Sequence, residues 1–234
     1  MDLSYIYQIY AFIKSFIYGL IMNPNSPCST YNSYYMILKD LKDGSTLLDI
    51  GVGDGVYFNN PKVAELITTK NLKIKCIDID RNAVEICQER IQKAGLSDFV
   101  TAETVNLLDI KDRYDYVLFM DCYPVIDLNL IDKLVKHSRT LSENILMYHN
   151  LFREKNDLVA FIKPRLKYFT LNDFGRLTTI DEMEHIILSW GFDSFEINEK
   201  IECCFGDITP LFRYIPVLNK MKIYQYLVCL NNKV

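Results

Sequence analysis

Short apolar runs alternate with longer amphipathic segments through most of the chain. The apolar runs fall at residues 45–50, 72–79, 99–106, 114–120 and 144–152. Runs of this kind are typical of strands that are buried on both faces of a parallel sheet. The segments that separate them carry apolar positions at helical spacing and fall at residues 60–70, 80–95 and 129–141. This alternation predicts a series of right-handed βαβ crossovers.

Two of the predicted helices have clear end signals. Asn60 precedes Pro61, which suits an N-cap followed by the first helical position. Asp80 is the N-cap candidate of the next helix, and Gly95 is its predicted end. The apolar face predicted for this second helix consists of Ala83, Ile86, Cys87 and Ile91. Both helices are therefore expected to pack on the sheet through one apolar stripe.

The last third of the chain resumes this alternation of strands and helices after an interruption. Residues 153–178 mix charged and aromatic positions with one proline, which predicts an insertion rather than another βα unit. Thr179 and Glu182 then form a capping-box pattern for a helix that ends at Gly191. Two further strand candidates follow, at residues 192–202 and 222–232.

These elements predict one α/β domain over residues 1–234, with a doubly wound, mostly parallel seven-stranded sheet. A chain of this length can bury a continuous core without disulfides or a metal, and no linker or repeat divides it. The predicted parts are N-terminal helices (1–44), a core (45–152), the insertion (153–178) and a C-terminal helix with strands (179–234).

The amino-acid composition indicates which classes of binding partner and metal site to expect. The formal net charge is −4, and no run of lysine and arginine would follow a phosphate backbone. Nucleic acid is therefore not favoured as a partner, although the segment FIKPRLKYF is locally basic. The seven cysteines contain no C-x-x-C pair, and no histidine stands near Cys203 and Cys204 to complete a zinc site. We expect a protein of the reducing cytoplasm without a metal site.

The N-terminal segment of residues 5–22 is apolar but interrupted. Gln8, Lys14 and Gly19 lie within it, and tyrosines occur along its whole length rather than at its two ends. Its apolar residues recur at helical spacing, which favours a helix over the domain's own surface or pocket. Two alternatives remain open, a helix that makes peripheral contact with a membrane and a membrane span.

The stretch LLDIGVGDGVYF combines a predicted strand with a glycine loop. Gly51, Gly53 and Gly55 follow the strand directly, so the backbone can approach a ligand at the carboxyl edge of the sheet. Asp49 and Asp54 stand among these glycines, and carboxylates beside a pyrophosphate would be unfavourable. The loop therefore favours a nucleoside with a cationic tail over a dinucleotide, and S-adenosylmethionine fits that description.

Asp78 comes at the end of the next predicted strand, directly after the apolar residues IKCI. It stands roughly 20 residues beyond the glycine loop, which is the interval at which related nucleotide folds place a carboxylate that binds the ribose. A capping or surface carboxylate is the alternative interpretation. Its position at the ligand edge favours ribose binding.

With both motifs in this order, the sequence resembles the class I S-adenosylmethionine-dependent methyltransferases. LLDIGVGDG is similar to the first motif of that family, and CIDIDRNAVEICQERI to the second. The resemblance runs from about residue 47 to residue 152, with a further likeness in LTTIDEMEHIILSWGF. It implies a Rossmann-like methyltransferase fold with S-adenosyl-L-methionine as cofactor.

The resemblance also implies roles for individual residues. The cofactor-binding positions that it indicates are Asp49, Gly51, Gly53, Gly55, Asp78, Ile79, Asn106, Leu107 and Asp121. Asp78 matches the ribose carboxylate and Ile79 the apolar residue beside the adenine. Asn106 departs from the family, which often has an acidic residue there, but an amide can make a similar hydrogen bond. Asp121 follows the strand of the fourth motif.

Tyr123 and His149 are the candidates for catalytic or acceptor-binding roles. Both follow or end strands that reach the active-site edge in the resembling family, and a phenol or an imidazole can remove a proton from an acceptor. The N-terminal helices and the 153–178 insertion usually cover the pocket in that family. Here both are apolar and rich in tyrosine, which favours a small-molecule or lipid-like acceptor. A protein or RNA methyltransferase and a non-catalytic binding or scaffold protein are the alternatives.

Overall fold

The computed structural model describes residues 30–120, 126, 128–152, 178–192, 194–204 and 222–231. The strands are β1 (Thr46–Ile50), β2 (Lys73–Asp78), β3 (Val100–Thr104), β4 (Tyr116–Met120), β5 (Asn144–Phe152), β6 (Thr178–Thr179), β7 (Phe195–Cys204) and β8 (Lys222–Asn231). The α-helices are α2 (Thr30–Asp40), α3 (Pro61–Thr69), α4 (Arg81–Lys93), α5 (Leu128–Leu141) and α7 (Ile180–Ser189). Two 3₁₀ turns, η1 (Val56–Asn59) and η2 (Leu107–Asp109), complete the elements.

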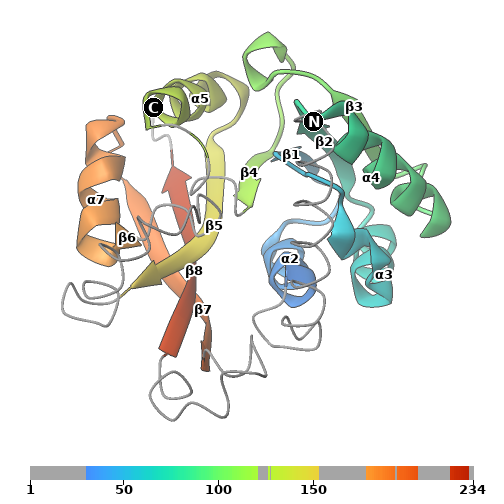
Figure 1. Ribbon diagram of the computed structural model, residues 1–234, viewed down its shortest axis with the longest axis horizontal. Coiled ribbons are helices and arrows are strands. Elements are labelled where there is room, and N and C mark those ends of the chain that lie inside the picture. Colours follow the sequence, from blue (N-terminus) through green and yellow to red (C-terminus); the bar gives the residue numbers. More distant parts are fainter. Residues whose placement is uncertain are drawn as a thin grey trace, which may run out of the picture.

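The sheet has the strand order β3-β2-β1-β4-β5-β8-β7, with the two-residue β6 pairing beside β5. Strands β3, β2, β1, β4 and β5 are parallel to one another. β8 lies between β5 and β7 and runs antiparallel to both (Figure 1). The predicted seven-stranded, mostly parallel sheet is confirmed, and β8 is its reversed strand. The strand order reverses beside β1, which is where doubly wound sheets bind their ligands.

The predicted helix ends agree with the structure. The side chain of Asn60 accepts a hydrogen bond from the Lys62 N–H at 3.0 Å, with Pro61 as the first helical residue of α3. Thr179 and Glu182 form the reciprocal capping box of α7, with N–O distances of 3.0 and 3.2 Å. Each cap satisfies main-chain N–H groups that have no partner inside the helix.

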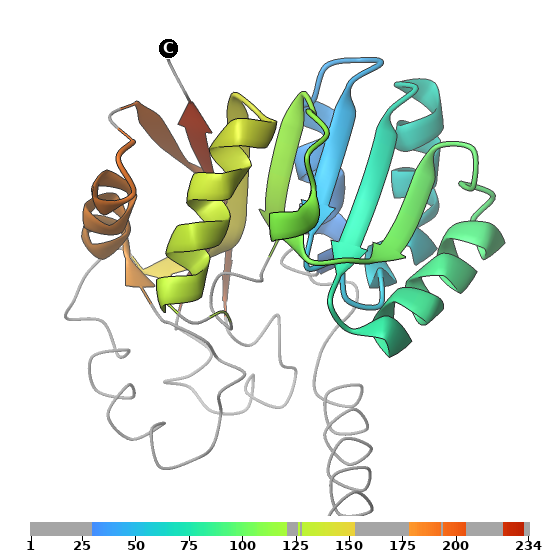
Figure 2. The same cartoon turned by 90° about the horizontal axis from the view of Figure 1, so that it is seen from above.

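Two apolar cores cover the two faces of the sheet. Side chains from α2, α3 and α4 form the first core, and side chains from α5 and α7 contribute to the second. Figure 2 shows α5 in front of the sheet and α2 behind it. Because successive strand residues point to opposite faces, Leu47 of β1 lies in the first core and Leu48 in the second. β1 is therefore buried on both sides, and the glycine loop begins at its carboxyl end.

The prediction for the buried face of α4 is partly wrong. Val84, Cys87 and Ile91 are the buried residues of this helix, whereas the side chain of Ile86 is 45% exposed. Both sets of positions repeat at helical spacing, so the sequence pattern alone leaves the rotation of the helix undecided. Contact with the sheet selects the stripe that contains Val84.

Several predictions lie outside the described residues. They concern the apolar segment 5–22, most of the 153–178 insertion, Asp121 and Tyr123. Within the described residues, no helix is both long enough and apolar enough to cross a membrane.

Candidate functional site

The glycine loop leaves the carboxyl end of β1 and is held against the end of β2. The N–H groups of Gly51 and Val52 both donate to the carbonyl oxygen of Ile77, at 2.8 and 3.2 Å. Gly51, Gly53 and Gly55 have φ angles of 71°, 55° and 62°, a left-handed conformation that favours glycine. The loop therefore turns sharply at the sheet edge while its backbone stays open to a ligand.

Two of these glycines meet different surroundings. A Cβ atom on Gly55 would overlap with Sγ of Cys87 from α4, so the loop packs closely on that helix. A Cβ atom on Gly53 would meet no heavy atom within 4 Å. Gly55 thus fixes the loop to the domain, and Gly53 faces open space.

Asp78 ties the glycine loop to the second strand. Its Oδ2 accepts a hydrogen bond from the Gly53 N–H at 2.8 Å, and its Oδ1 accepts one from the Asp80 N–H at 2.9 Å. The carboxylate is half-buried, and two such oxygens can accept further hydrogen bonds beyond these two. Asp78 therefore stands at the loop, in the position expected of a group that binds ribose hydroxyls.

Apolar side chains stand exposed beside Asp78. Ile79 has 79% of its surface exposed, and Leu108, in the turn that follows β3, has 40% exposed. Leu107 is buried in the second core instead. Asn106 accepts a hydrogen bond from the Leu108 N–H at 3.0 Å, which caps η2 and leaves the amide NH₂ group as its donor. Leu108, which was not among the predicted residues, is therefore the exposed apolar side chain of this turn.

Asp49 lies beneath the glycine loop and is only 1% exposed. Its Oδ2 accepts hydrogen bonds from the hydroxyl groups of Tyr34, at 3.0 Å, and Tyr57. Burial raises the pKa of Asp49 to about 7, although both tyrosine hydroxyls act to lower it. Its Oδ1 is buried and has no hydrogen-bond partner among the described residues. Neither Tyr34 nor Tyr57 belongs to the residues predicted for this site from the sequence.

Asp54 forms an ion pair with helix α4. Nη1 of Arg90, on α4, lies 2.8 Å from Oδ1 of Asp54 and also donates to its carbonyl oxygen. The two carboxylates that the sequence places among the glycines therefore have different surroundings. Arg90 neutralises Asp54, and Asp49 is buried with a raised pKa.

The described residues do not include the side chain of either catalytic candidate, so neither can be placed at this site. The backbone of His149 lies in β5, opposite Tyr226 of β8, and its side chain is outside the described part of the structure. Tyr123 and Asp121 lie outside it altogether. Their assignments stay predictions.

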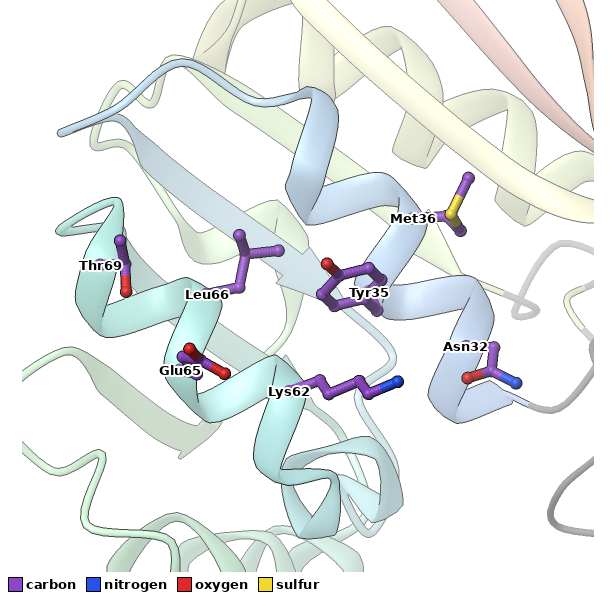
Figure 3. Close-up of a pocket in the computed structure, with 7 residues that line it drawn as sticks. All are labelled: Asn32, Tyr35, Met36, Lys62, Glu65, Leu66 and Thr69. Carbon is purple, nitrogen blue, oxygen red and sulfur yellow. The ribbon is translucent and has the colours of Figure 1, made fainter.

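A separate hollow of about 640 Å³ lies between α2 and α3 (Figure 3). Its lining residues are Asn32, Tyr35, Met36, Lys62, Glu65, Leu66 and Thr69. None of them belongs to the predicted site. The chemistry of the strand edge, rather than this hollow, identifies the candidate cofactor site.

Comparison with protein families gives one match that covers most of the chain. The family described as mycolic acid cyclopropane synthetase matches residues 31–201. This range includes the glycine loop, Asp78 and all of the parallel strands β1 to β5.

Among curated proteins, the chain is similar to the ribosomal protein L11 methyltransferase of Dictyoglomus thermophilum. The two are 27% identical over 165 residues, which is 65% of this chain and 52% of that protein. The chain thus spans about half the length of the curated relatives it matches.

Two solved structures share the fold at low identity. The YcgJ protein from Bacillus subtilis has a TM-score of 0.60 at 12% identity, covering 87% of this chain and 100% of that one. The magnesium protoporphyrin IX methyltransferase from Synechocystis, with bound S-adenosylhomocysteine, has a TM-score of 0.54 at 15% identity, covering 86% and 82%.

Proposed function

The chain belongs to the mycolic acid cyclopropane synthetase family of class I S-adenosylmethionine-dependent methyltransferases, and from that premise we propose that it transfers a methyl group to a small-molecule or lipid-like acceptor. The S-adenosylmethionine cofactor of this family would be held by the glycine loop, Asp78 and the exposed apolar residues beside them.

One observation supports this cofactor site above the others. Ile79 is 79% exposed, although it directly follows a buried strand and stands next to a carboxylate that faces the loop. A large aliphatic side chain exposed at a ligand edge is well suited to cover one face of a purine, and Asp78 beside it suits the ribose hydroxyl groups. The same edge carries Leu108, so apolar contact is available from two neighbouring turns.

The residues at the other end of the loop fit an amino-acid tail. The buried Oδ1 of Asp49 has no donor within the part of the chain that the structure describes, and a cationic ammonium group would supply one. Gly53 leaves open space where a side chain would otherwise obstruct the ligand. When bound, S-adenosylmethionine supplies a methyl group on a sulfonium, which is an excellent leaving group. The chain is then left to orient the acceptor and, where the acceptor requires it, to remove a proton.

We assign the acceptor-side roles to Tyr123 and His149. A phenol and an imidazole near the ends of neighbouring parallel strands would face the same edge of the sheet as the cofactor site. Either could accept a proton or hold the acceptor by a hydrogen bond.

The family favours an acceptor of lipid character. Its description refers to mycolic acid, and the tyrosine-rich N-terminal segment and insertion of this chain would form an apolar cover over such an acceptor. Tyrosine rings would also suit a cationic head group through cation–π contact. A protein acceptor is the second candidate, because the curated relatives are ribosomal protein L11 methyltransferases.

A transfer assay separates these acceptors. The full chain is incubated with S-adenosylmethionine labelled in its methyl group, together with a lipid extract, a small-metabolite extract or a ribosomal protein fraction. We expect label in the lipid or small-molecule fraction and none in protein. Label confined to protein would support the second candidate, and no label in any fraction, with cofactor binding intact, would indicate a non-catalytic binding protein.

A further inference from the structure

Asp49 is held by two tyrosines from separate elements. Tyr34 belongs to α2 and Tyr57 to η1, and both hydroxyl groups donate to the same carboxylate oxygen, Oδ2. Their rings stack with centroids 3.7 Å apart and an interplanar angle of 17°, and both meet Phe58 edge to face. The rotation of the Asp49 carboxylate is therefore fixed from one side.

The second oxygen of Asp49 is in a different situation. Oδ1 is buried, and no group in the described part of the chain donates a hydrogen bond to it. A buried carboxylate oxygen that accepts no hydrogen bond lowers the stability of the fold. Native structures rarely contain such an oxygen unless a ligand or a water molecule donates to it. The residue stands two positions before Gly51, so a ligand cradled by the glycine loop is the nearest candidate.

The titratable groups around Asp49 include no cation among the described residues. Tyr34 faces it from α2 and Tyr57 from η1, and Asp78 and Cys76 of β2 also interact with it. None of these side chains can carry a positive charge. A cationic group of a ligand would therefore not have to displace a cationic side chain of the described residues from Asp49.

We propose that Tyr34 and Tyr57 are positioning residues that clamp Oδ2 of Asp49 and thereby present Oδ1 to the α-ammonium group of the bound cofactor. Because Tyr34 lies on α2, the same clamp couples the position of that helix to occupancy of the cofactor site. This inference rests on the proposed function, since it requires a cofactor with an amino-acid tail.

Cofactor binding should then depend on the charge of Asp49. Burial raises the pKa of Asp49 to about 7, and the hydroxyl groups of Tyr57 and Tyr34 act in the opposite direction. An ammonium group selects the ionised carboxylate, so affinity should rise as the pH increases through this range, and binding near pH 7 should release a proton. Removing either hydroxyl group should raise the pKa of Asp49 further and move the rise in affinity to higher pH.

The test is calorimetric titration of the full chain with S-adenosylhomocysteine between pH 5.5 and 7.5, repeated in buffers of different ionisation enthalpy to count protons. For the unmodified chain we expect the affinity to increase by about tenfold or more across this range, with release of part of a proton near pH 7. For Tyr34→Phe and Tyr57→Phe we expect the midpoint to move upward by about one pH unit. Tyr35→Phe removes a hydroxyl group from the same helix and should leave the profile unchanged.

The ligand 5′-methylthioadenosine provides the second control, because it has the nucleoside but no ammonium group. Its affinity should be independent of pH and unaffected by Tyr34→Phe. The proposal is overturned if the unmodified chain binds S-adenosylhomocysteine with no pH dependence and no proton release, or if Tyr35→Phe shifts the profile as much as Tyr34→Phe. Absence of all binding to the unmodified chain would instead overturn the proposed function, which keeps the two failures distinct.

Discussion

The main-chain N–H of Gly53 donates to Oδ2 of Asp78 at 2.8 Å, so the carboxylate at the end of β2 holds the loop that follows β1. The two motifs that indicate the cofactor are therefore a single structural unit. One carboxylate orients the glycine loop, receives a second N–H from Asp80 and retains acceptor capacity for a ligand. Changes at Asp78 should consequently affect the loop and the ligand together.

Replacement of Asp78 by alanine should abolish most of the affinity for S-adenosylmethionine. Each hydrogen bond to a charged group contributes about 1.5–3 kcal/mol, so we expect the dissociation constant to rise by roughly 100-fold or more. Equilibrium dialysis with labelled cofactor measures the change. Asp80→Ala is the matched control. It removes the N-cap of α4, which costs about 1 kcal/mol of stability, but should leave the affinity nearly unchanged. Equal losses in the two variants would contradict the role given to Asp78.

Ile79→Ala should weaken cofactor binding without lowering the stability of the free protein. The side chain is 79% exposed, so its truncation removes little buried surface before the ligand arrives. Lost contact with the purine should cost about 1 kcal/mol, or roughly fivefold in the dissociation constant. Ile86→Ala, on the exposed face of α4, is the comparison, and it should change neither quantity. Binding titrations and thermal unfolding of both variants check this, and an unaltered affinity for Ile79→Ala would count against a purine at this position.

Gly55→Ala should destabilise the domain more than Gly44→Ala. Both glycines have a positive φ angle, 62° and 73°, where an alanine costs about 1–2 kcal/mol. A Cβ atom meets Cys87 at Gly55 and nothing within 4 Å at Gly44, so overpacking should add roughly 1–3 kcal/mol at Gly55 only. Denaturant unfolding of the two variants gives the difference. Equal free energies of unfolding would show that the loop does not pack against α4 as described.

The raised pKa of Asp49 predicts how stability depends on pH. The carboxyl group binds a proton in the folded state up to about pH 7, whereas in the unfolded chain it ionises near 3.8. Its contribution is therefore fully present below pH 3.8 and lost as the pH rises toward 7, with a slope of up to about 1.4 kcal/mol per pH unit. We expect this slope in the difference between the unmodified chain and Asp49→Asn, measured by denaturant unfolding from pH 4.5 to 7.5. A difference that is constant with pH, or that grows in favour of the unmodified chain, would contradict the burial of a protonated Asp49.

Local signals predicted much of the fold. The bounds of β5 agree with the predicted residues 144–152, and the caps at Asn60, Asp80 and Thr179 are as expected. These features depend on neighbours within a few residues, so the sequence is sufficient to identify them. The order of β8 between β5 and β7 depends on pairing between distant segments, which no local pattern records.

The candidate site was predicted less completely, for the same physical reason. Asp78 ends a strand and Ile79 follows it, and their position at the ligand edge can be read from one segment. The partner of Asp54, Arg90, is 36 residues away, and Tyr34 is 15 residues before Asp49. Tyrosines are common in this sequence, so nothing in the local pattern distinguishes the two that bind a buried carboxylate. The electrostatic surroundings of Asp49 and Asp54 therefore depend on contacts between distant parts of the sequence.

Calorimetric titration of the unmodified full chain with S-adenosylmethionine and, separately, with NAD⁺ tests the cofactor assignment most directly. The carboxyl edge of β1 and β2 carries Asp78 beside the glycine loop, and the chain belongs to a family of S-adenosylmethionine-dependent enzymes. We predict saturable binding of one S-adenosylmethionine molecule per chain and no binding of NAD⁺. Saturable binding of NAD⁺, or the absence of any binding of S-adenosylmethionine, would contradict the account.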